Sequence, residues 1–296
     1  MTQKILYKLF VMFDSIICWI GQHLLLLSYE MRVVSYILWK FKKRNDDIFL
    51  ASYPKAGNTI LQMMLYQMTT DGSMDIEHIS TKIPWFEDAA IFNSKTIEET
   101  ISPRIFKTHL YYKYLPKNGK VIYVVRNVKD TCVSYFYHLV SERNFMNMNM
   151  KTFCKRFIRG TLIHGSWEKH LLSWLPHRYD KRVLFLQFNE LKETPLNVIK
   201  KINKFCNFNL SELKMKQVAK RCNLKYMKQF NYLFDPRLSI YRRNDQKKYA
   251  AQFIRNGSMA QWNTDLSNEQ NNDLNNIIDK LKNKIILNDN DNFLIK

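Results

Sequence analysis

The feature that most constrains this chain is the stretch from Ser52 to Thr59, which reads Ser-Tyr-Pro-Lys-Ala-Gly-Asn-Thr. An apolar run at 48–51 precedes it, and a helix-like run at 60–68 follows it. A strand, a tight turn with a glycine and a helix start form an anion-binding loop, because main-chain N–H groups at a helix N-terminus point outward with the positive end of the helix dipole. The sequence therefore predicts that this turn holds a phosphate, with Lys55 and Thr59 as side-chain donors.

The order of residues in this loop differs from that of the P-loop of nucleotide kinases. The P-loop motif G-x-x-x-x-G-K-[ST] places its lysine directly after a glycine. Here Lys55 precedes Gly57, and no Gly-Lys-Ser or Gly-Lys-Thr follows. The sequence also contains no acidic cluster that would hold Mg²⁺. These observations argue against an ATPase, a GTPase or a kinase, and they favour another phosphate-bearing ligand.

Apolar runs of alternating type follow residue 45, as an open parallel sheet with crossover helices requires. We predict an α/β fold in a single domain, 45–296, with a P-loop-like open parallel sheet and helices on both faces. Asn58 or Thr59 is expected to cap the first helix. The predicted strands lie at 48–52, 104–109, 121–125 and 183–188, and the predicted helices at 60–68, 130–140, 191–205 and 268–281.

Side chains of chemical interest follow all four predicted strands at their carboxyl ends. In open parallel sheets, ligands bind outside these ends, so we expect the side chains to meet around one ligand. They are Lys55 after the first strand, Lys107 and His109 in the second, Arg126 after the third, and Phe188-Asn189-Glu190 after the fourth.

The N-terminal segment, 1–44, is treated as separate because its composition differs from that of the rest. Residues 10–29 are almost wholly apolar, and basic residues flank them on both sides. Three alternatives stay open. The apolar run spans a bilayer; it forms an interfacial helix pair with 33–41 as second arm and the basic cluster 42–44 on anionic headgroups; or it is a helix packed on the domain.

The formal net charge of +20 favours polyanions, nucleic acid or an anionic membrane as partner, and does not distinguish among them. No recognised nucleic-acid reader motif is present, so we expect no nucleic-acid partner. The 5 cysteines are scattered and form no C-x-x-C pair, which indicates neither a disulfide framework nor a zinc site. We therefore expect a reducing, cytoplasmic location, with membrane association through 1–44 as an open alternative.

Four motifs in order give the chain a specific resemblance to the PAPS-dependent (cytosolic-type) sulfotransferases. Residues 53–59 resemble the family's 5′-phosphosulfate loop, and Pro103-Arg-Ile-Phe-Lys-Thr-His-Leu110 resembles its P-R-x-x-K-T-H-L segment. Residues 125–135 resemble its 3′-phosphate element, and 253–262 are similar to its R-K-G-x-x-G-D-W motif. The resemblance covers essentially the whole chain apart from the N-terminal segment and the last helix.

The resemblance implies transfer of a sulfuryl group from the co-substrate PAPS to a hydroxyl or amine of a small acceptor, without a metal. It implies that His109 is the general base and that Lys55 and Lys107 contact the transferred group. The residues implied to hold the 5′-phosphosulfate are Lys55, Ala56, Gly57, Asn58 and Thr59. Those implied to hold the 3′-phosphate are Arg126, Ser134, Arg255 and Gly257.

Elementary chemistry agrees with these roles. Sulfuryl transfer, like phosphoryl transfer, needs in-line positioning and stabilisation of charge on oxygens more than covalent help. A histidine with an ordinary pKa accepts a proton at neutral pH, which suits an alcohol or phenol that attacks as it loses its proton.

The chain departs from the family pattern at the base-binding positions. Ile60 stands where the family has a Trp that stacks on adenine, Leu224 where a Phe is common, and Phe188 where a Tyr is usual. Losing one aromatic stack costs on the order of 1 kcal/mol. Asn256 replaces a Lys and Gln261 an Asp in the C-terminal motif. We therefore expect the protein to bind the nucleotide base more weakly than the phosphate and phosphosulfate groups.

Several features leave alternatives open. Pro84–Glu87 either lines an acceptor pocket or packs in the interior, and His138 is either a second base or a buried hydrogen-bonded histidine. The family's dimer motif, K-x-x-x-T-V-x-x-x-E, does not follow Trp262. The apolar N-terminus favours a hydrophobic acceptor. The alternative function is a non-catalytic protein of the sulfotransferase fold that binds a polyanion or a membrane surface.

Overall fold

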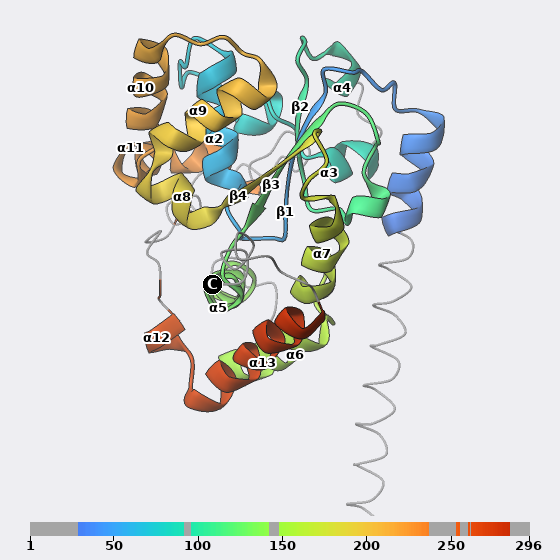
Figure 1. The fold of residues 1–296 in the computed structure, drawn as a ribbon, viewed down its shortest axis with the longest axis vertical. Coiled ribbons are helices and arrows are strands. Elements are labelled where there is room, and N and C mark those ends of the chain that lie inside the picture. The colour runs from blue at the N-terminus through green and yellow to red at the C-terminus, as the bar shows by residue number, and fades with distance from the viewer. Residues whose placement is uncertain are drawn as a thin grey trace, which may run out of the picture.

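The computed structural model describes residues 29–91, 96–141, 148–236, 253–254, 260 and 262–284 (Figure 1). Within these residues a single sheet contains β1 (Ile48–Ser52), β2 (Ile105–Thr108), β3 (Lys120–Val125) and β4 (Val183–Gln187). All neighbouring strands are parallel, in the order β2-β1-β3-β4. The predicted strands and the α/β class are confirmed. Strands of β-branched and aromatic residues suit this sheet because parallel strands are buried on both faces.

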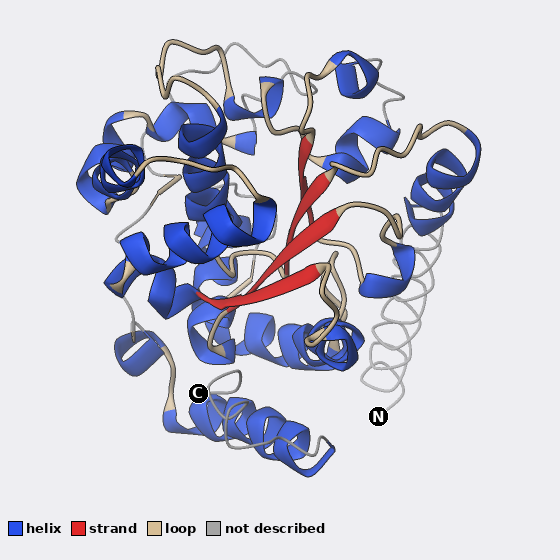
Figure 2. Cartoon of the chain, turned by 45° about the horizontal axis from the view of Figure 1, so that its top comes forward, coloured by secondary structure: helices blue, strands red, loops and turns tan. Residues whose placement is uncertain are grey.

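Helices surround the sheet in both views (Figures 1 and 2). The helices that precede β4 are α2 (Asn58–Thr69), α3 (Phe86–Ile91), α4 (Thr96–Glu99), α5 (Val128–Phe136), α6 (Met150–Arg159) and α7 (Trp167–Trp174). Those that follow β4 are α8 (Phe188–Glu193), α9 (Pro195–Cys206), α10 (Glu212–Arg221), α11 (Leu224–Gln229), α12 (Trp262–Asp265) and α13 (Asn268–Lys284).

Two predicted helices differ from the observed ones for identifiable reasons. Helix α5 starts at Val128, earlier than predicted, because the side chain of Asn127 accepts hydrogen bonds from the first-turn N–H groups and caps it. Its last turn continues as a π-helical turn at Tyr137–Ser141. The stretch predicted as one helix at 191–205 is divided between α8 and α9. The division falls before Pro195, because a proline cannot continue the preceding helix.

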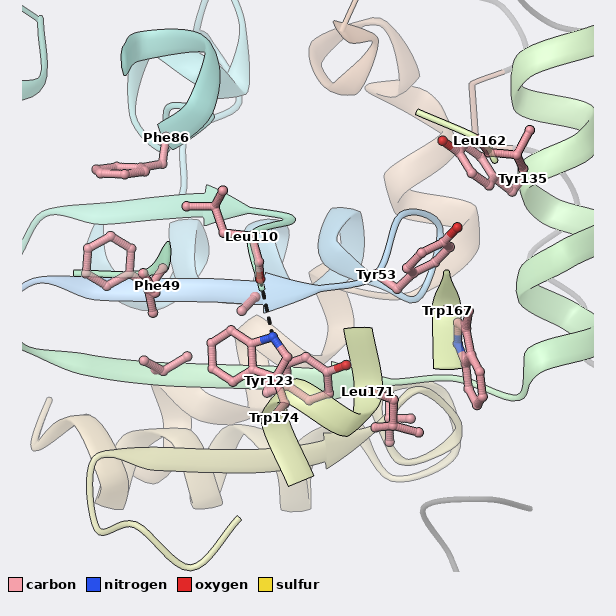
Figure 3. Close-up of a cluster of buried hydrophobic side chains, with 14 of the residues drawn as sticks. Phe49, Tyr53, Phe86, Leu110, Tyr123, Tyr135, Leu162, Trp167, Leu171 and Trp174 are labelled. Atoms are coloured by element: carbon pink, nitrogen blue, oxygen red, sulfur yellow. Dashed lines mark hydrogen bonds between the residues drawn. The ribbon is translucent and has the colours of Figure 1, made fainter. Parts of the chain in front are cut away.

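The strands separate two hydrophobic clusters. Phe49 and Tyr123 point into one cluster, which contains side chains of α3, α5, α6, α7 and α13. Leu50 and Ile122 point into the other, which contains side chains of α2, α9 and α10. This alternation follows from the two-residue period of a strand. Figure 3 shows the first cluster, where the indole of Trp174 on α7 donates to the carbonyl of Leu110, just after β2.

Residues 29–39 are helical and pack on the domain by one face. Val33 and Tyr36 are buried in the first cluster, whereas Leu38 is 67% exposed and Trp39 82% exposed. Among the residues described here, no helix is both long and apolar enough to cross a bilayer. Most of the apolar run at 10–29 lies outside the described residues.

A buried ion pair anchors the start of β2. The guanidinium of Arg104 donates from Nε and Nη2 to the carboxylate of Asp47, at 2.7 and 2.9 Å. Both residues are fully buried. Asn118, before β3, donates to the same carboxylate at 2.9 Å. Although Arg104 belongs to the motif at 103–110, it fixes the starts of strands rather than lining the ligand cavity.

Candidate active site

A cavity of about 580 Å³ lies at the carboxyl ends of the strands. The chain passes from β1 to β2 on one side and then returns past β1 to β3 on the other, so this is the switch point at which such sheets bind ligands. The cavity is lined by most of the predicted site residues, namely Lys55, Gly57, Asn58, Thr59, Lys107, His109, Arg126 and Ser134. Ala56, within the loop, is buried and is not among the lining residues, and Arg255 and Gly257 lie outside the described residues.

The loop after β1 has a backbone conformation that needs glycine. Gly57 has φ +127°, a region that side-chain-bearing residues rarely adopt, and a Cβ there would lie 2.8 Å from Cδ2 of Phe188. Lys55 also has a positive φ of 65°. The turn therefore brings the main chain of the loop close against the residue that follows β4.

The prediction that Asn58 or Thr59 caps α2 is wrong. Helix α2 begins at Asn58, its cap residue is Gly57, and no side chain caps it. Instead Asn58 turns inward, and its Nδ2 donates to the carbonyl of Thr108 at 3.2 Å. This bond ties the loop after β1 to the end of β2. It also leaves the positive N-terminus of α2 without a competing side-chain oxygen, as an anion site requires.

The imidazole of His109 is fixed in one tautomer by its surroundings. Its Nδ1 lies 2.8 Å from the main-chain oxygen of Ser52. A carbonyl oxygen only accepts, so Nδ1 carries the proton and Nε2 carries the lone pair. Burial, and then the charge of Lys107, hold the pKa of His109 well below its ordinary value. At neutral pH the ring is therefore uncharged, and Nε2 is the nitrogen left to accept a proton.

The main chain of His109 is held from two sides. Its N–H donates to Oε1 of Glu87, on α3, at 2.6 Å. Its carbonyl lies 3.2 Å from Nε2 of His170, on α7. Glu87 is almost completely buried, and this burial raises its pKa to about 7. Glu87 was named only as part of the segment Pro84–Glu87, and His170 was not predicted for the site, since a lone Glu and a lone His carry no distinctive sequence signal.

Lys107 is positioned by the segment that precedes α3. Its N–H donates to the carbonyl of Pro84 at 2.9 Å, which makes an additional bridge at the edge of β2. Its ammonium lies 4.8 Å from the ring centre of Trp85. Within the segment Pro84–Glu87, Phe86 is buried in the core, as the packing interpretation predicts, and Trp85 lines the cavity. A contact of Trp85 with the acceptor stays a prediction.

Arg126, directly after β3, contacts residues that follow β1 and β4. Its guanidinium lies over the ring of Phe188 at 4.2 Å, and its Nη1 donates to the carbonyl of Lys55 at 3.1 Å. Ser134 lines the same cavity from α5. The positions at which the chain departs from the family pattern lie around these residues, since Ile60, Leu224 and Phe188 all line the cavity.

Further residues line the cavity that sequence reasoning did not assign to a ligand. His164 lies in the loop before α7, with its ring centre 5.3 Å from that of His109, and Lys192 extends from α8. His138, considered above as a second base or a buried histidine, is half-buried and also lines the cavity. The ring centre of Phe253, at the start of the C-terminal motif, lies 4.7 Å from the ammonium of Lys55. His164 and Lys192 join the other side chains only through the fold, because their sequence spacing follows no ligand-binding pattern.

The cavity combines cationic side chains with a neutral imidazole. Lys55, Lys107, Arg126 and Lys192 all line it. In the part of the chain that the structure describes, no group of three or more His, Cys, Asp or Glu side chains is arranged to hold a metal ion. The arrangement suits a substrate with two anionic groups and a transfer assisted by proton removal.

Comparison with known proteins agrees with this geometry. The family model described as "Sulfotransferase domain" matches residues 45–285. Mouse sulfotransferase 1B1 is 30% identical over 239 residues, covering 75% of this chain and 78% of that protein. Luciferin sulfotransferase of Photinus pyralis is 31% identical over 259 residues, covering 77% and 70%.

Solved structures give the same result. Mouse sulfotransferase SULT7A1 complexed with PAP is 26% identical, with a TM-score of 0.69, over 89% of this chain and 92% of that one. Retinol dehydratase in a complex with retinol and PAP shares the fold, with a TM-score of 0.72 at 19% identity, over 88% and 87%.

The chain therefore belongs to the sulfotransferase family. Its resemblance to the cytosolic-type members is confirmed, and the chain is an enzyme of the sulfuryl-transferring class.

Proposed function

We propose that this enzyme moves a sulfuryl group from PAPS to a hydroxyl or amine of a small acceptor, with His109 as general base. The observation that carries the proposal is the bond between Nδ1 of His109 and the carbonyl of Ser52. This bond leaves a lone pair on Nε2, in a cavity that Lys55 and Lys107 also line. A neutral imidazole beside two ammonium groups suits removal of a proton from an acceptor while negative charge develops nearby.

The residues present fit PAPS as donor. When bound, PAPS supplies a sulfuryl group on a phosphate leaving group. The uncapped N-terminus of α2 accepts an anion, and the close approach of Gly57 to Phe188 leaves no room for a side chain between the loop and the end of β4. Arg126 and Ser134 lie in the same cavity, on the segments that follow β3.

Each residue then has a definite task. Lys55 and the main chain of Ala56–Thr59 hold the 5′-phosphosulfate, and Lys55 stabilises charge on the leaving oxygen. Lys107 contacts the transferred group. Arg126 and Ser134 bind the 3′-phosphate through charge-assisted and hydroxyl hydrogen bonds. We assign Arg255 and Gly257 to the same phosphate by the resemblance of their motif alone.

The acceptor is a small molecule with an apolar or aromatic body. The wall around His109 contains the rings of Trp85 and His164, which face each other at 6.2 Å between centres. Two relatives carry the names luciferin sulfotransferase and amine sulfotransferase, which name small molecules as their acceptors.

Binding and transfer assays test the proposal. The purified protein is mixed with adenosine 3′,5′-bisphosphate in a calorimeter, and then with labelled PAPS and an acceptor panel. We expect wild type to bind the bisphosphate and to label at least one acceptor. His109→Ala should retain binding and lose about 10²–10⁴-fold in kcat, the usual contribution of a positioned base. Failure of wild type to bind the bisphosphate would contradict the proposal.

One observation favours a second activity, binding to an anionic membrane. Leu38 and Trp39 are 67% and 82% exposed at the end of helical residues 29–39, and Lys40, Lys42 and Lys43 follow directly. Exposed apolar side chains beside lysines suit the surface of an anionic bilayer. Vesicles with and without phosphatidylserine test this. We expect phosphatidylserine-dependent binding by wild type and its loss in a Leu38→Ser, Trp39→Ser double variant.

The same vesicles distinguish the alternative of a non-catalytic binding protein. That alternative predicts vesicle binding without any thermal shift from adenosine 3′,5′-bisphosphate. Equal binding to neutral and anionic vesicles would contradict the role of the lysines in binding an anionic membrane.

A further inference from the structure

We propose that His170 is a positioning residue for the general base, acting through the main chain of His109. The proposal rests on the proposed function of His109 and goes beyond it, because His170 is not expected to touch either substrate. The carbonyl of His109 lies 3.2 Å from Nε2 of His170. His170 is fully buried and is not among the residues that line the cavity.

The protonation of His170 follows from its two partners. The carbonyl of His109 only accepts, so Nε2 of His170 carries a proton and donates it to this bond. Nδ1 of His170 lies 3.1 Å from the hydroxyl of Tyr123, which therefore donates to the unprotonated nitrogen. Burial also lowers the pKa of His170 to about 4, so the ring stays neutral. Hydrogen bonds thus run from Tyr123 in β3, through His170 in α7, to the chain after β2.

Helix α7 makes this attachment twice. His170 and Trp174 lie four residues apart, and so on one face of the helix. The indole of Trp174 donates to the carbonyl of Leu110 at 3.3 Å, as Figure 3 shows. Two successive carbonyls of the catalytic segment are therefore bound by side chains of one helix. From the opposite side, Glu87 accepts the N–H of His109.

His170 also contacts the segment that leads into the phosphate loop. The ring of Tyr53 meets it edge-on, with centres 5.7 Å apart, and the hydroxyl of Tyr53 donates to the carbonyl of Gly165 at 2.9 Å. His170 therefore packs between the first residue after β1 and the base after β2. The imidazole of His109 keeps its tautomer only while the carbonyl of Ser52 stays opposite Nδ1, and both segments contact α7.

A small shift of His109 is expected to lower the rate, because misplacement of a catalytic group by about 1 Å costs on the order of 10²-fold. The effect should fall on kcat rather than on nucleotide affinity, since the anion-binding groups lie in the loop after β1, at the start of α2, directly after β3 and on α5. It should also free the proton of His109 to move between its two nitrogens.

The test uses the full chain with the substitutions His170→Phe, His170→Gln and, as matched control, His177→Phe. His177 lies outside the cavity, stacked on Tyr112. The measurements are kcat, the pH–rate profile, the Kd of adenosine 3′,5′-bisphosphate and long-range ¹H–¹⁵N spectra, which report the tautomer of His109. The His109 signals are assigned by comparison with His109→Gln.

For His170→Phe we expect kcat to fall by about 10- to 100-fold with an unchanged Kd. In the pH–rate profile of this variant, we expect the acid limb to move toward the ordinary pKa of an imidazole. The NMR signals of His109 should show a mixture of the two tautomers. His170→Gln keeps an N–H donor and should recover most of the rate, and His177→Phe should match wild type. Should His170→Phe not fold, Tyr123→Phe removes only the hydroxyl that orients His170, and it should lower kcat in the same direction.

The proposal would be overturned if folded His170→Phe kept the wild-type kcat and a single tautomer of His109. It would also be overturned if folded His170→Gln had a kcat no higher than that of His170→Phe. An equal loss of kcat in His177→Phe would overturn it as well. If His170→Phe does not fold and Tyr123→Phe is used instead, an unchanged kcat in Tyr123→Phe would overturn it. If wild type transfers no sulfuryl group, the proposed function fails, whereas the tautomer spectra still test the role of His170.

Discussion

The guanidinium of Arg126 lies 4.2 Å from the ring centre of Phe188, and it also donates to the carbonyl of Lys55. Phe188 therefore supports the arginine that we assign to the 3′-phosphate, although it lacks the hydroxyl usual at its position. Cation–π contacts of this kind are worth about 0.5–2 kcal/mol.

We expect Phe188→Ala to weaken the binding of adenosine 3′,5′-bisphosphate by about fivefold, because it removes this support. Phe188→Tyr keeps the ring and should bind at least as well as wild type. Isothermal titration calorimetry measures both. Unchanged affinity in Phe188→Ala would show that the ring does not hold Arg126 in its binding position.

Gly57→Ala should abolish most nucleotide binding. The new Cβ would lie 2.8 Å from Phe188 and would force a rarely allowed φ on alanine. Gly160→Ala is the matched control, because Gly160 also has a positive φ of 70° but caps α6. We expect the control to lower thermal stability and to leave the affinity for adenosine 3′,5′-bisphosphate unchanged. Equal affinity losses in the two variants would argue against a local role of the loop.

Ile60→Trp should raise nucleotide affinity. Ile60 lines the cavity at the start of α2, at the position where the family stacks a Trp on adenine. Restoring one stack is worth about 1 kcal/mol, or about a fivefold lower Kd. Competition between adenosine and guanosine bisphosphates shows whether the gain depends on the base. A weaker binder would indicate that the surrounding side chains leave no space for the indole.

Removing one member of the Asp47–Arg104 pair should destabilise the protein without altering the site. Both side chains are fully buried, and removing Arg104 leaves the charge of Asp47 without its ion-pair partner, at a cost of about 3–5 kcal/mol. We expect this loss for Arg104→Met in urea unfolding monitored by fluorescence. The loss should be smaller for Asp47→Asn, because the carboxylate of Glu98 remains 3.6 Å from the guanidinium of Arg104. The folded fraction should keep the wild-type Kd for the bisphosphate. A change in Kd would mean that the pair also positions the cavity.

Glu87 gives the protein a pH-dependent stability. Burial raises its pKa from 4.5 to about 7, so the folded state holds more protons than the unfolded state between these values. Its contribution is fully present below about pH 4.5 and is lost as pH rises through 7, by on the order of 3 kcal/mol. We expect Glu87→Gln to remove this decline, measured as the difference in unfolding free energy from wild type across that range. If the unfolding free energies of wild type and Glu87→Gln changed with pH in parallel, Glu87 would not be the source of the decline.

The motifs were sufficient to predict the fold, and most of the site residues that they named line the cavity. Lys55, His109 and Arg126 each follow or end an apolar run, and parallel strands bring their carboxyl ends to one edge of the sheet. The cap of α2 was predicted wrongly because Asn58 is a good capping residue by local preference. Its preference is overridden by Thr108, whose carbonyl lies on a different strand.

The sequence by itself determined the anion-binding loop at Tyr53–Thr59, the order of the strand-end residues and the family, because each depends on local pattern and chain direction. Only the tertiary structure decided which residues hold the base. Glu87 and His170 are separated from His109 by 22 and 61 positions, and burial against the sheet brings them to its N–H and carbonyl. The tautomer of His109 was decided in the same way, since it depends on the carbonyl of Ser52 in a neighbouring strand.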